Sequence, residues 1–586
     1  MVNRFIKNRQ RVITFEVTIL FILFWIWWFY KQIKIGTFNF SDTFFHASRV
    51  YEIRYAFLHH ELPNWLNYQS YFGLGQAVNA MYPDISLWPF VLLTLPLSFK
   101  DQLVALRIII LFLTWLVTYI SLRHHEVSID VALFASIIYT LSGYSLYLAV
   151  NEFQVGTGII YIFSFPLFFT LQELFETHRM HWWLILKLAL LFSIVLYSHL
   201  LSAIVLAIII TFIVLYRWLI EFKSNRYVIL NLICSGLLTI IYTLPIFIRY
   251  FWITKSKVSP PYHQGIVDGL NFVDLFYQSS WSATARYAVP LVAIVLLSIT
   301  LVHSKNPAIF KLIGIETFLI FISSDIFPWV IFDKIPLINN LQVAAWRFAI
   351  WLSIIPIIVY LKEFKPKCFK QTSYRFLCIL AIIAIFASIQ SIKTTDIKFM
   401  QNVDGSNVRL NEKLMKKFQG RNLTKNNELH RLWLIRDYAP LEASPKGSGI
   451  NTTKTTQSLA FKPSISNENH KVVRVKKQPI NNGIKMKIMD NLDGRYVRLP
   501  LYGYRTVDYS VKLNNKIIKY QDSNGYIQIK PGQELKAGDM VTVKTQNPRI
   551  YAPIALLSII LFVISCIPFL GGAIYKKCSS KYLMLS

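Results

Sequence analysis

The sequence predicts a mostly α-helical protein that crosses a membrane many times and carries a β-rich domain on its outer side. Three observations support this fold class. Hydrophobic residues make up 54% of the 586-residue chain and charged residues only 16%, a balance typical of polytopic membrane proteins. Long apolar segments recur along most of the chain, and apolar and polar residues alternate in a stretch before the last of these segments.

The apolar segments predict about twelve membrane-spanning helices, although several are short for a hydrocarbon core that needs roughly 20 residues. The first follows a basic N-terminus without a small-residue cleavage site after it, so we expect a retained signal anchor. The segments are Val12–Tyr30, Gln102–Leu122, Val131–Val150, Gly156–Leu171, Trp182–Tyr197, Leu201–Ile220, Tyr227–Tyr250, Tyr287–Val302, Ile309–Ser323, Ala345–Leu361, Phe376–Ile392 and Tyr551–Ile574.

One further apolar segment, Ile85–Phe99, holds Pro89 and Pro96 within a short run, which suits a re-entrant or interfacial helix better than a span. When this segment is not counted, lysine and arginine gather in loops on one side of the membrane, as the positive-inside rule requires of cytoplasmic loops. We therefore expect a multi-pass plasma-membrane protein with both termini in the cytoplasm.

This orientation divides the chain into three parts. Residues 1–392 form the transmembrane domain, whose first outer loop is 31–101. Residues 393–550 form an outer domain, and residues 551–586 form a last helix with a short cytoplasmic tail. We expect strands in the outer domain, because four of its stretches alternate and are separated by turn-forming residues. These stretches are YVRLPLYGY, DYSVKLNNKIIKY, GYIQIKPGQ and DMVTVKTQ.

The formal net charge is +30, yet no nucleic-acid-binding motif is present, so we do not expect a nucleic-acid partner. Much of the excess lies in cytoplasmic loops and in the outer domain, where about 29 basic residues outnumber 13 acidic ones. The outer domain either has a generally soluble surface or faces anionic lipid headgroups or anionic wall polymers. None of the five cysteines lies in it, so it must fold without disulfides.

The stretch SDTFFHASRVYEIR, just beyond the first apolar segment, holds three residues that could carry chemistry. On a helix, Asp42, His46 and Arg49 fall four and then three residues apart, so they share one face. A carboxylate, an imidazole and a guanidinium aligned at a membrane surface could move a proton and hold a phosphate. The alternative is a solvated helix beside the membrane.

Two more candidates end a later run of the same loop. Tyr82 could stack on a sugar, or it could belong to the aromatic belt at headgroup level. Asp84 could be a second catalytic or metal-binding acid.

Later outer segments add two candidates. Arg347 lies just inside the outer end of a predicted span, where a guanidinium must pair with an anion, line a wet cavity or snorkel to the headgroups. His199 lies in a tight outer turn between two spans and is either a turn residue or a site residue. A proton- or ion-coupled carrier would bury carboxylates near the midplane, and the sequence offers no convincing set of them.

Together these stretches resemble one known family. SDTFFHASRVYEIR, LPNWLNYQSYFGLGQAVNAMYPD, IPLINNLQVAAWRF and the C-terminal LPLYGYRTVDYSV are similar to the YfhO-like membrane proteins of bacteria, which belong to the GT-C class of glycosyltransferases. The resemblance extends loosely over most of the chain. The sequence departs from the family pattern where Ala345, not a proline, precedes the Trp-Arg pair and the Gln342–Arg347 spacing is one residue longer.

The resemblance implies a GT-C-like enzyme of the bacterial plasma membrane. It would take a sugar from a polyprenyl phosphate outside the membrane and place it on an exported acceptor, such as a teichoic acid or another cell-surface glycan. Asp42 matches the acid in the first outer loop of GT-C enzymes and would be a general base or a cation ligand. The residues expected to bind substrate or phosphate are His46, Arg49, Tyr82, His199, Gln342 and Arg347.

The sequence leaves open whether a metal cofactor takes part and whether the protein is an enzyme at all. A divalent cation, Mg²⁺ or Mn²⁺, could assist at Asp42 together with phosphate oxygens. A transporter or flippase for lipid-linked sugars or surface polymers would share the many spans and the arginines. A non-catalytic membrane scaffold that presents the outer domain is a third function class.

Overall fold

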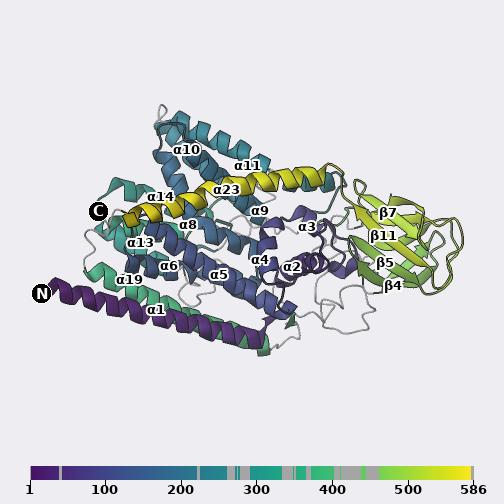
Figure 1. Cartoon of the computed structure of the whole chain (residues 1–586), viewed down its shortest axis with the longest axis horizontal. Helices are drawn as coiled ribbons and strands as arrows, with labels where there is room; N and C mark the ends of the chain where they lie inside the picture. The colour runs from purple at the N-terminus through teal and green to yellow at the C-terminus, as the bar shows by residue number, and fades with distance from the viewer. Residues whose placement is uncertain are drawn as a thin grey trace.

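A bundle of long helices and a β-rich domain make up the protein, and helices predominate. The structure is a computed structural model that describes residues 2–38, 42–220, 225–260, 271–273, 275–276, 291–332, 335, 347–348, 351–364, 371–401, 409–410, 437–443, 459–460 and 462–582. Figure 1 shows the β-rich domain at one end of the molecule and both chain termini at the opposite end.

Within the described residues, seven helices are long and apolar enough to cross a membrane, or eight if a pair bent by 53° counts as one span. The bent pair joins α6 (Ile129–Thr140) to the segment Gly143–Glu152. The expected count of twelve is not confirmed by this measure and stays a prediction. The seven helices are α1 (Val2–Ile35), α5 (Phe99–His124), α8 (Val155–Glu176), α10 (Leu200–Ile220), α11 (Asn225–Thr254), α19 (Gln371–Gln401) and α23 (Tyr551–Tyr582).

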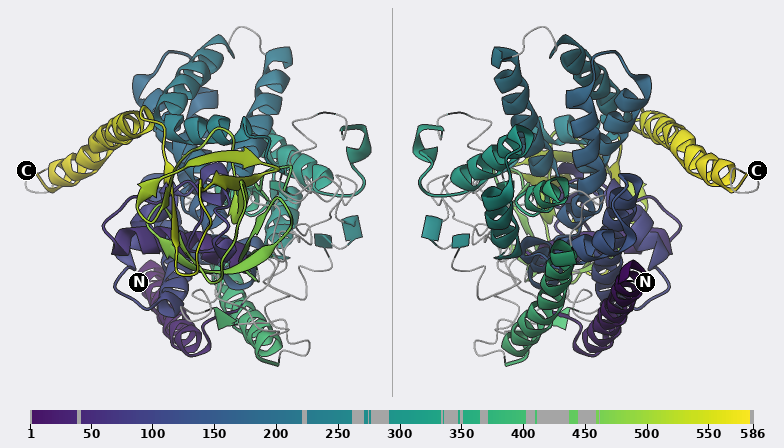
Figure 2. Two further views of the ribbon diagram at one scale, coloured as in Figure 1. Left: turned by 90° about the vertical axis from the view of Figure 1, so that its right-hand side faces the viewer. Right: turned by 90° about the vertical axis from the view of Figure 1, so that its left-hand side faces the viewer.

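Shorter helices complete the bundle (Figures 1 and 2). They are α9 (Trp182–Ser198), α13 (Leu291–His303), α14 (Pro307–Ile322), α15 (Trp329–Phe332) and α18 (Ile354–Glu363). The proline-containing segment Ile85–Phe99 forms only η2 (Ile85–Leu87), α4 (Trp88–Leu93) and the start of α5. Six residues of helix extend about 9 Å, so α4 is too short to cross, as the sequence predicted.

Two glycines let the central helices approach each other closely. A Cβ at Gly158 would lie 2.9 Å from the side chain of Ile110 on α5. A Cβ at Gly156 would lie 2.3 Å from the carbonyl oxygen of Ser198, at the end of α9. Only glycine permits such contacts, so these two positions fix the N-terminal end of α8 against α5 and against the turn between α9 and α10.

The β-rich domain is a single antiparallel sheet of nine strands in the order β8-β7-β11-β5-β4-β3-β6-β10-β9. All four predicted stretches contain strands, but the sequence interpretation missed β3, β4 and β5. The strands are β3 (Ser464–Asn467), β4 (Val472–Ile480), β5 (Gly483–Ile488), β6 (Val497–Tyr502), β7 (Asp508–Leu513), β8 (Lys516–Ile517), β9 (Lys519–Ser523), β10 (Tyr526–Lys530) and β11 (Met540–Gln546). A further short pair joins β1 (Thr37–Phe38) to β2 (Arg409–Leu410).

The sheet packs onto the first outer loop, which forms α2 (Thr43–Leu58), η1 (Tyr71–Gly73) and α3 (Val78–Met81). The backbone N–H of Tyr502 donates to the carbonyl of Leu74 at 2.8 Å, and the buried Lys477 ammonium donates to the carbonyls of Gly73 and Pro500 at 3.1 and 2.7 Å. Burial lowers the pKa of Lys477 to about 7. In Figure 1, α2 and α3 lie between most of the bundle and the β-rich domain, and α11 and α23 reach the domain directly.

Candidate functional site

Helix α2 begins just after Asp42 and carries His46 and Arg49, the two residues that the sequence placed on one face with it. His46 lies one turn after Asp42, and its Nδ1 is 3.4 Å from Nη1 of Arg49. Most of α2 is buried between the bundle and the β-rich domain, and Arg49 has no exposed surface. The alternative of a solvated helix beside the membrane is therefore wrong. Asp42 lies at the start of α2 and stays exposed.

Tyr82 lies at the centre of a cluster of cationic and aromatic side chains. The guanidinium carbon of Arg49 is 4.1 Å from the centre of the Tyr82 ring, and Arg49 Nη2 donates to the carbonyl of Pro83. The rings of His46 and His199 have their centres 5.8 and 5.5 Å from that of Tyr82. Residues from α2, the following loop and the α9–α10 turn thus meet around one phenol ring.

His199 has the turn role that the sequence allowed, and its role as a site residue stays a prediction. Its Nδ1 accepts from the backbone N–H of Ser202 at 3.2 Å, which caps the start of α10, and lies 2.8 Å from the Ser202 hydroxyl. Its ring also faces Tyr82. Arg347 belongs to the same cluster, because its charge acts on His46, His199 and Tyr82. Gln342 lies outside the described residues.

Burial makes both histidines poor bases. It lowers the pKa of His46 and of His199 well below 6.5, and the charges of Arg49 and Arg347 lower both further. Arginine can only donate, so a neutral His46 accepts at Nδ1 from Arg49 and carries its proton on Nε2. At neutral pH, two neutral imidazoles and the Arg49 guanidinium therefore lie around Tyr82, and the charge of Arg347 also acts on it.

Arg49 has no carboxylate partner among the residues that the structure describes. The ion pairs of the described chain do not include it, and its Nε has no hydrogen-bond partner there. Such a buried cation is costly by several kcal/mol unless an anion compensates it. The charge of Asp84, which pairs with Arg249, acts on Arg49 without forming an ion pair with it, so an anionic ligand at this position would add to a partial compensation.

On the other side of Asp42 lies a second carboxylate that sequence reasoning missed. The Gln154 amide donates to Glu152 Oε2 at 2.5 Å and reaches Asp42 Oδ2 at 3.5 Å. The Tyr147 hydroxyl donates to Glu152 Oε1 at 2.7 Å. Glu152 ends η3 (Leu148–Glu152), a π-helical turn after α7 (Gly143–Tyr147), and such turns are frequent at functional sites.

Asp84, suggested by the sequence as a second catalytic or metal-binding acid, lies in a buried network of hydrogen bonds. Its Oδ1 accepts from Arg249 Nη1 at 2.7 Å, and its Oδ2 accepts from the Trp88 indole at 3.1 Å. Arg249 also donates to the hydroxyl of Tyr551. Because both carboxylate oxygens are engaged in a buried network, the geometry favours a structural role for Asp84, joining the first loop to α11 and α23, over a catalytic one.

Glu52, on the same helix, holds the loop that leads to Tyr82. Its Oε1 accepts from the backbone N–H groups of Gln69 and Ser70 at 2.6 and 2.7 Å and from the Ser70 hydroxyl at 2.8 Å. The next residues, Tyr71 and Phe72, have φ of 48° and 61°, a strained conformation that this anchor stabilises. Burial raises the pKa of Glu52 to about 8. Glu52 follows Arg49 by three residues, a spacing that puts both on one helix face. This spacing could have indicated Glu52 as a further residue of the site.

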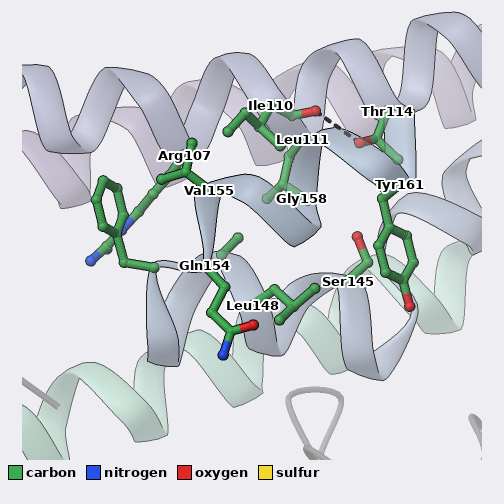
Figure 3. Close-up of a pocket in the computed structure, with 12 residues that line it drawn as sticks. Arg107, Ile110, Leu111, Thr114, Ser145, Leu148, Gln154, Val155, Gly158 and Tyr161 are labelled. Carbon is green, nitrogen blue, oxygen red and sulfur yellow. Dashed lines mark hydrogen bonds between the residues drawn. The ribbon is translucent and has the colours of Figure 1, made fainter. Parts of the chain in front are cut away.

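A cavity lies beside Gln154, between α5, α8 and the segment of α7 and η3 (Figure 3). Most of its lining is apolar, and Arg107 and Tyr161 lie at opposite ends. Arg107 Nη1 donates to Gln32 Oε1 at 3.1 Å. The Nε of Arg107 and the hydroxyl of Tyr161 have no hydrogen-bond partner among the described residues. The cavity thus combines apolar walls with unused polar groups.

No protein-family model matches this chain, and neither does any curated protein. The resemblance to the YfhO-like proteins therefore stays a prediction from the residues. Among the described residues no group of three His, Cys, Asp or Glu side chains could hold a metal ion.

The substitution Glu52→Gln tests the loop anchor. The folded-state pKa of about 8 lies above the ordinary 4.5, so the contribution of Glu52 to stability is full below pH 4.5 and is lost as the pH rises through 8. We expect the free energy of unfolding of the unsubstituted protein to fall over this range by up to about 1.4 kcal/mol per pH unit. Glu52→Gln should reduce this dependence, because its amide oxygen accepts the same bonds without titrating.

Thermal unfolding in detergent at several pH values measures the effect. Glu61→Gln, a substitution of a half-buried acid beyond the end of α2, is the matched control and should leave the dependence unchanged. Equal pH dependence in Glu52→Gln and in the unsubstituted protein would contradict the anchor.

Proposed function

We propose that the protein is a membrane glycosyltransferase that moves a sugar from a polyprenyl phosphate to an exported acceptor, such as a teichoic acid or another surface glycan. The observation that carries this proposal is the buried Arg49, which lacks a carboxylate partner among the described residues and lies near Arg347 and two neutral histidines. The resemblance of the first loop and of the Trp-Arg stretch to GT-C enzymes adds support.

The cationic cluster suits the phosphate of a lipid carrier. A guanidinium presents paired donors to phosphate oxygens, and Arg49 and Arg347 supply two such groups. A neutral His46 with its proton on Nε2 adds an uncharged donor. These groups favour a ligand with an anionic phosphate head.

Asp42 is the group best suited to take a proton. It is exposed, lies at the start of the helix that carries Arg49, and contacts the Gln154 amide. In the proposed reaction, Asp42 accepts the proton of the acceptor hydroxyl as its oxygen bonds to the anomeric carbon. The bond from that carbon to the lipid phosphate breaks, and the phosphate oxygen leaves with the electron pair beside the arginines. The described residues offer no metal cluster, so no step is assigned to a metal.

Asp42→Asn removes the proposed base and should lower kcat by roughly 10²–10⁴-fold. The melting temperature should stay unchanged, because the side chain is exposed. Purified protein with a polyprenyl-phosphate sugar and an acceptor provides the assay. Asp101→Asn changes another acid on the same side, at the start of α5, and should keep full activity. Full activity of Asp42→Asn would remove Asp42 from the reaction.

Arg49→Met separates phosphate binding from structure. Replacing an unpaired buried charge by an apolar side chain of similar volume is often neutral or stabilising, so the melting temperature should stay or rise. Without the guanidinium, the KM for the lipid-linked sugar should increase at least about tenfold.

The matched control is Arg54→Met, on the same helix. Arg54 donates to the Leu95 carbonyl and to Gln102 Oε1 at 2.9 and 3.1 Å, so its loss should lower stability and leave KM unchanged. If Arg49→Met instead lowers stability and leaves KM unchanged, Arg49 is structural and the phosphate site is elsewhere.

One observation favours a second function, transport of a lipid-linked sugar or surface polymer. The sequence offered no convincing carboxylate near the midplane, yet Glu316, near the middle of α14, is fully buried. Neither of its carboxylate oxygens has a hydrogen-bond partner among the described residues. An intramembrane acid of this kind is a common feature of ion and substrate pathways.

Glu316→Gln distinguishes the two functions. A transporter would lose translocation of a fluorescent lipid-linked sugar in proteoliposomes, whereas the proposed transferase should keep its rate of product formation within about twofold. Glu363→Gln, at the inner end of α18, is the control, since Glu363 accepts from the Ser304 hydroxyl. Loss of translocation in Glu316→Gln together with normal translocation in Asp42→Asn would favour the transporter.

A further inference from the structure

One exposed face of the β-rich domain is strongly basic. Along β4, Val473, Val475 and Lys477 point into the core, so the residues between them point outward. The strands β5, β11 and β7 continue this outward face through their cross-strand pairs. Its basic residues, here called the lysine face, are Arg474, Lys476, Lys485, Lys487, Lys512 and Lys544.

The register places these charges side by side. Lys476 lies directly opposite Lys487, and Lys485 and Lys512 both pair with Thr542 from opposite sides. Like charges directly opposite each other destabilise a sheet. None of the six makes an ion pair with a described residue. The sole acid in the four strands is Asp508, at the start of β7. Folding alone gives no reason to concentrate charge in this way.

The spacing and position of the face favour a polymer as its ligand. Neighbouring strands lie about 5 Å apart and outward residues along one strand about 7 Å apart, so the charges form a two-dimensional array. A small anion could contact one or two of them, whereas an extended polyanion could contact most of them. The domain projects beyond α2 and α3, away from most of the long helices, while α11 and α23 end at its near edge (Figure 1).

We propose that the lysine face binds an extended phosphate-bearing polymer outside the membrane. The binding itself does not depend on the transferase activity. Only the role of this polymer as the sugar acceptor rests on the proposed function. In that role, the face would hold the polymer on the domain that packs directly onto the loop carrying Asp42, and successive repeats could reach the site without full dissociation.

A matched pair of double variants tests the proposal. Lys476→Gln with Lys487→Gln removes an opposed pair from the lysine face. Lys519→Gln with Lys530→Gln removes an equally opposed pair from β9 and β10, two strands that hold no other lysine. Both pairs are exposed, so the melting temperature should stay unchanged in either variant.

The measurement is the affinity of the full-length protein in detergent for a long poly(glycerol phosphate) chain, with dextran as the uncharged polymer. The lysine-face variant should bind at least about fivefold more weakly and depend less on salt, and the control should change by less than about twofold. Equal affinity in both variants would overturn the proposal. The proposal would also be overturned if the unsubstituted protein bound phosphatidylglycerol vesicles but not the polymer. The lysine face would then be assigned to the membrane.

Activity with the same variants distinguishes the two proposals. The unsubstituted protein could bind the polymer and form no glycosylated product, while the lysine-face variant loses the binding. That result would contradict the transferase and support the binding face. Product formation on this polymer that is equal in both variants would contradict the acceptor role alone.

Discussion

The candidate site depends on one constraint, a buried guanidinium without an ion-paired carboxylate among the described residues. Arg49 is held by the Tyr82 ring and the Pro83 carbonyl, and both are neutral. Burial and the two arginines keep His46 and His199 uncharged, so these rings do not add to the repulsion. A cation in such surroundings is costly unless an anion joins it. The charge of Asp84 acts on Arg49 without forming an ion pair, and we propose that an anionic ligand, a phosphate, adds to this compensation.

Much of the fold follows from signals within short segments. Composition and long apolar runs predict a helical membrane protein, and alternation predicts the strands from β6 onward. The spacing of Asp42, His46 and Arg49 predicts a shared helix face; α2 carries His46 and Arg49, and Asp42 is the residue just before it. Pro89 and Pro96 correctly separate the short outer helices from the spans. These features depend on local periodicity and backbone chemistry, and a single sequence is enough to show both.

The remaining features depend on contacts between distant segments. The sequence suggests Asp84 as a catalytic or metal-binding acid, but its partner Arg249 lies 165 residues away. Strand β4 was missed because Lys477 occupies an inward position, where three carbonyls accept from its ammonium. Glu152 and Glu316 are buried by neighbouring helices that no local pattern predicts. Tertiary packing decides which charged side chains are buried. The buried charged residues that say most about function are therefore the ones that a sequence alone predicts least well.

Thermal unfolding with a polyprenyl phosphate and with the polyprenol of equal chain length is the most direct test of an anion at Arg49. The two lipids share the apolar tail and differ only in the phosphate, so their comparison isolates the charge that the site lacks. We predict that the phosphate raises the melting temperature of the purified protein by several degrees more than the alcohol, as specific binding to the folded state requires. Equal stabilisation by both lipids would contradict a phosphate site at this position.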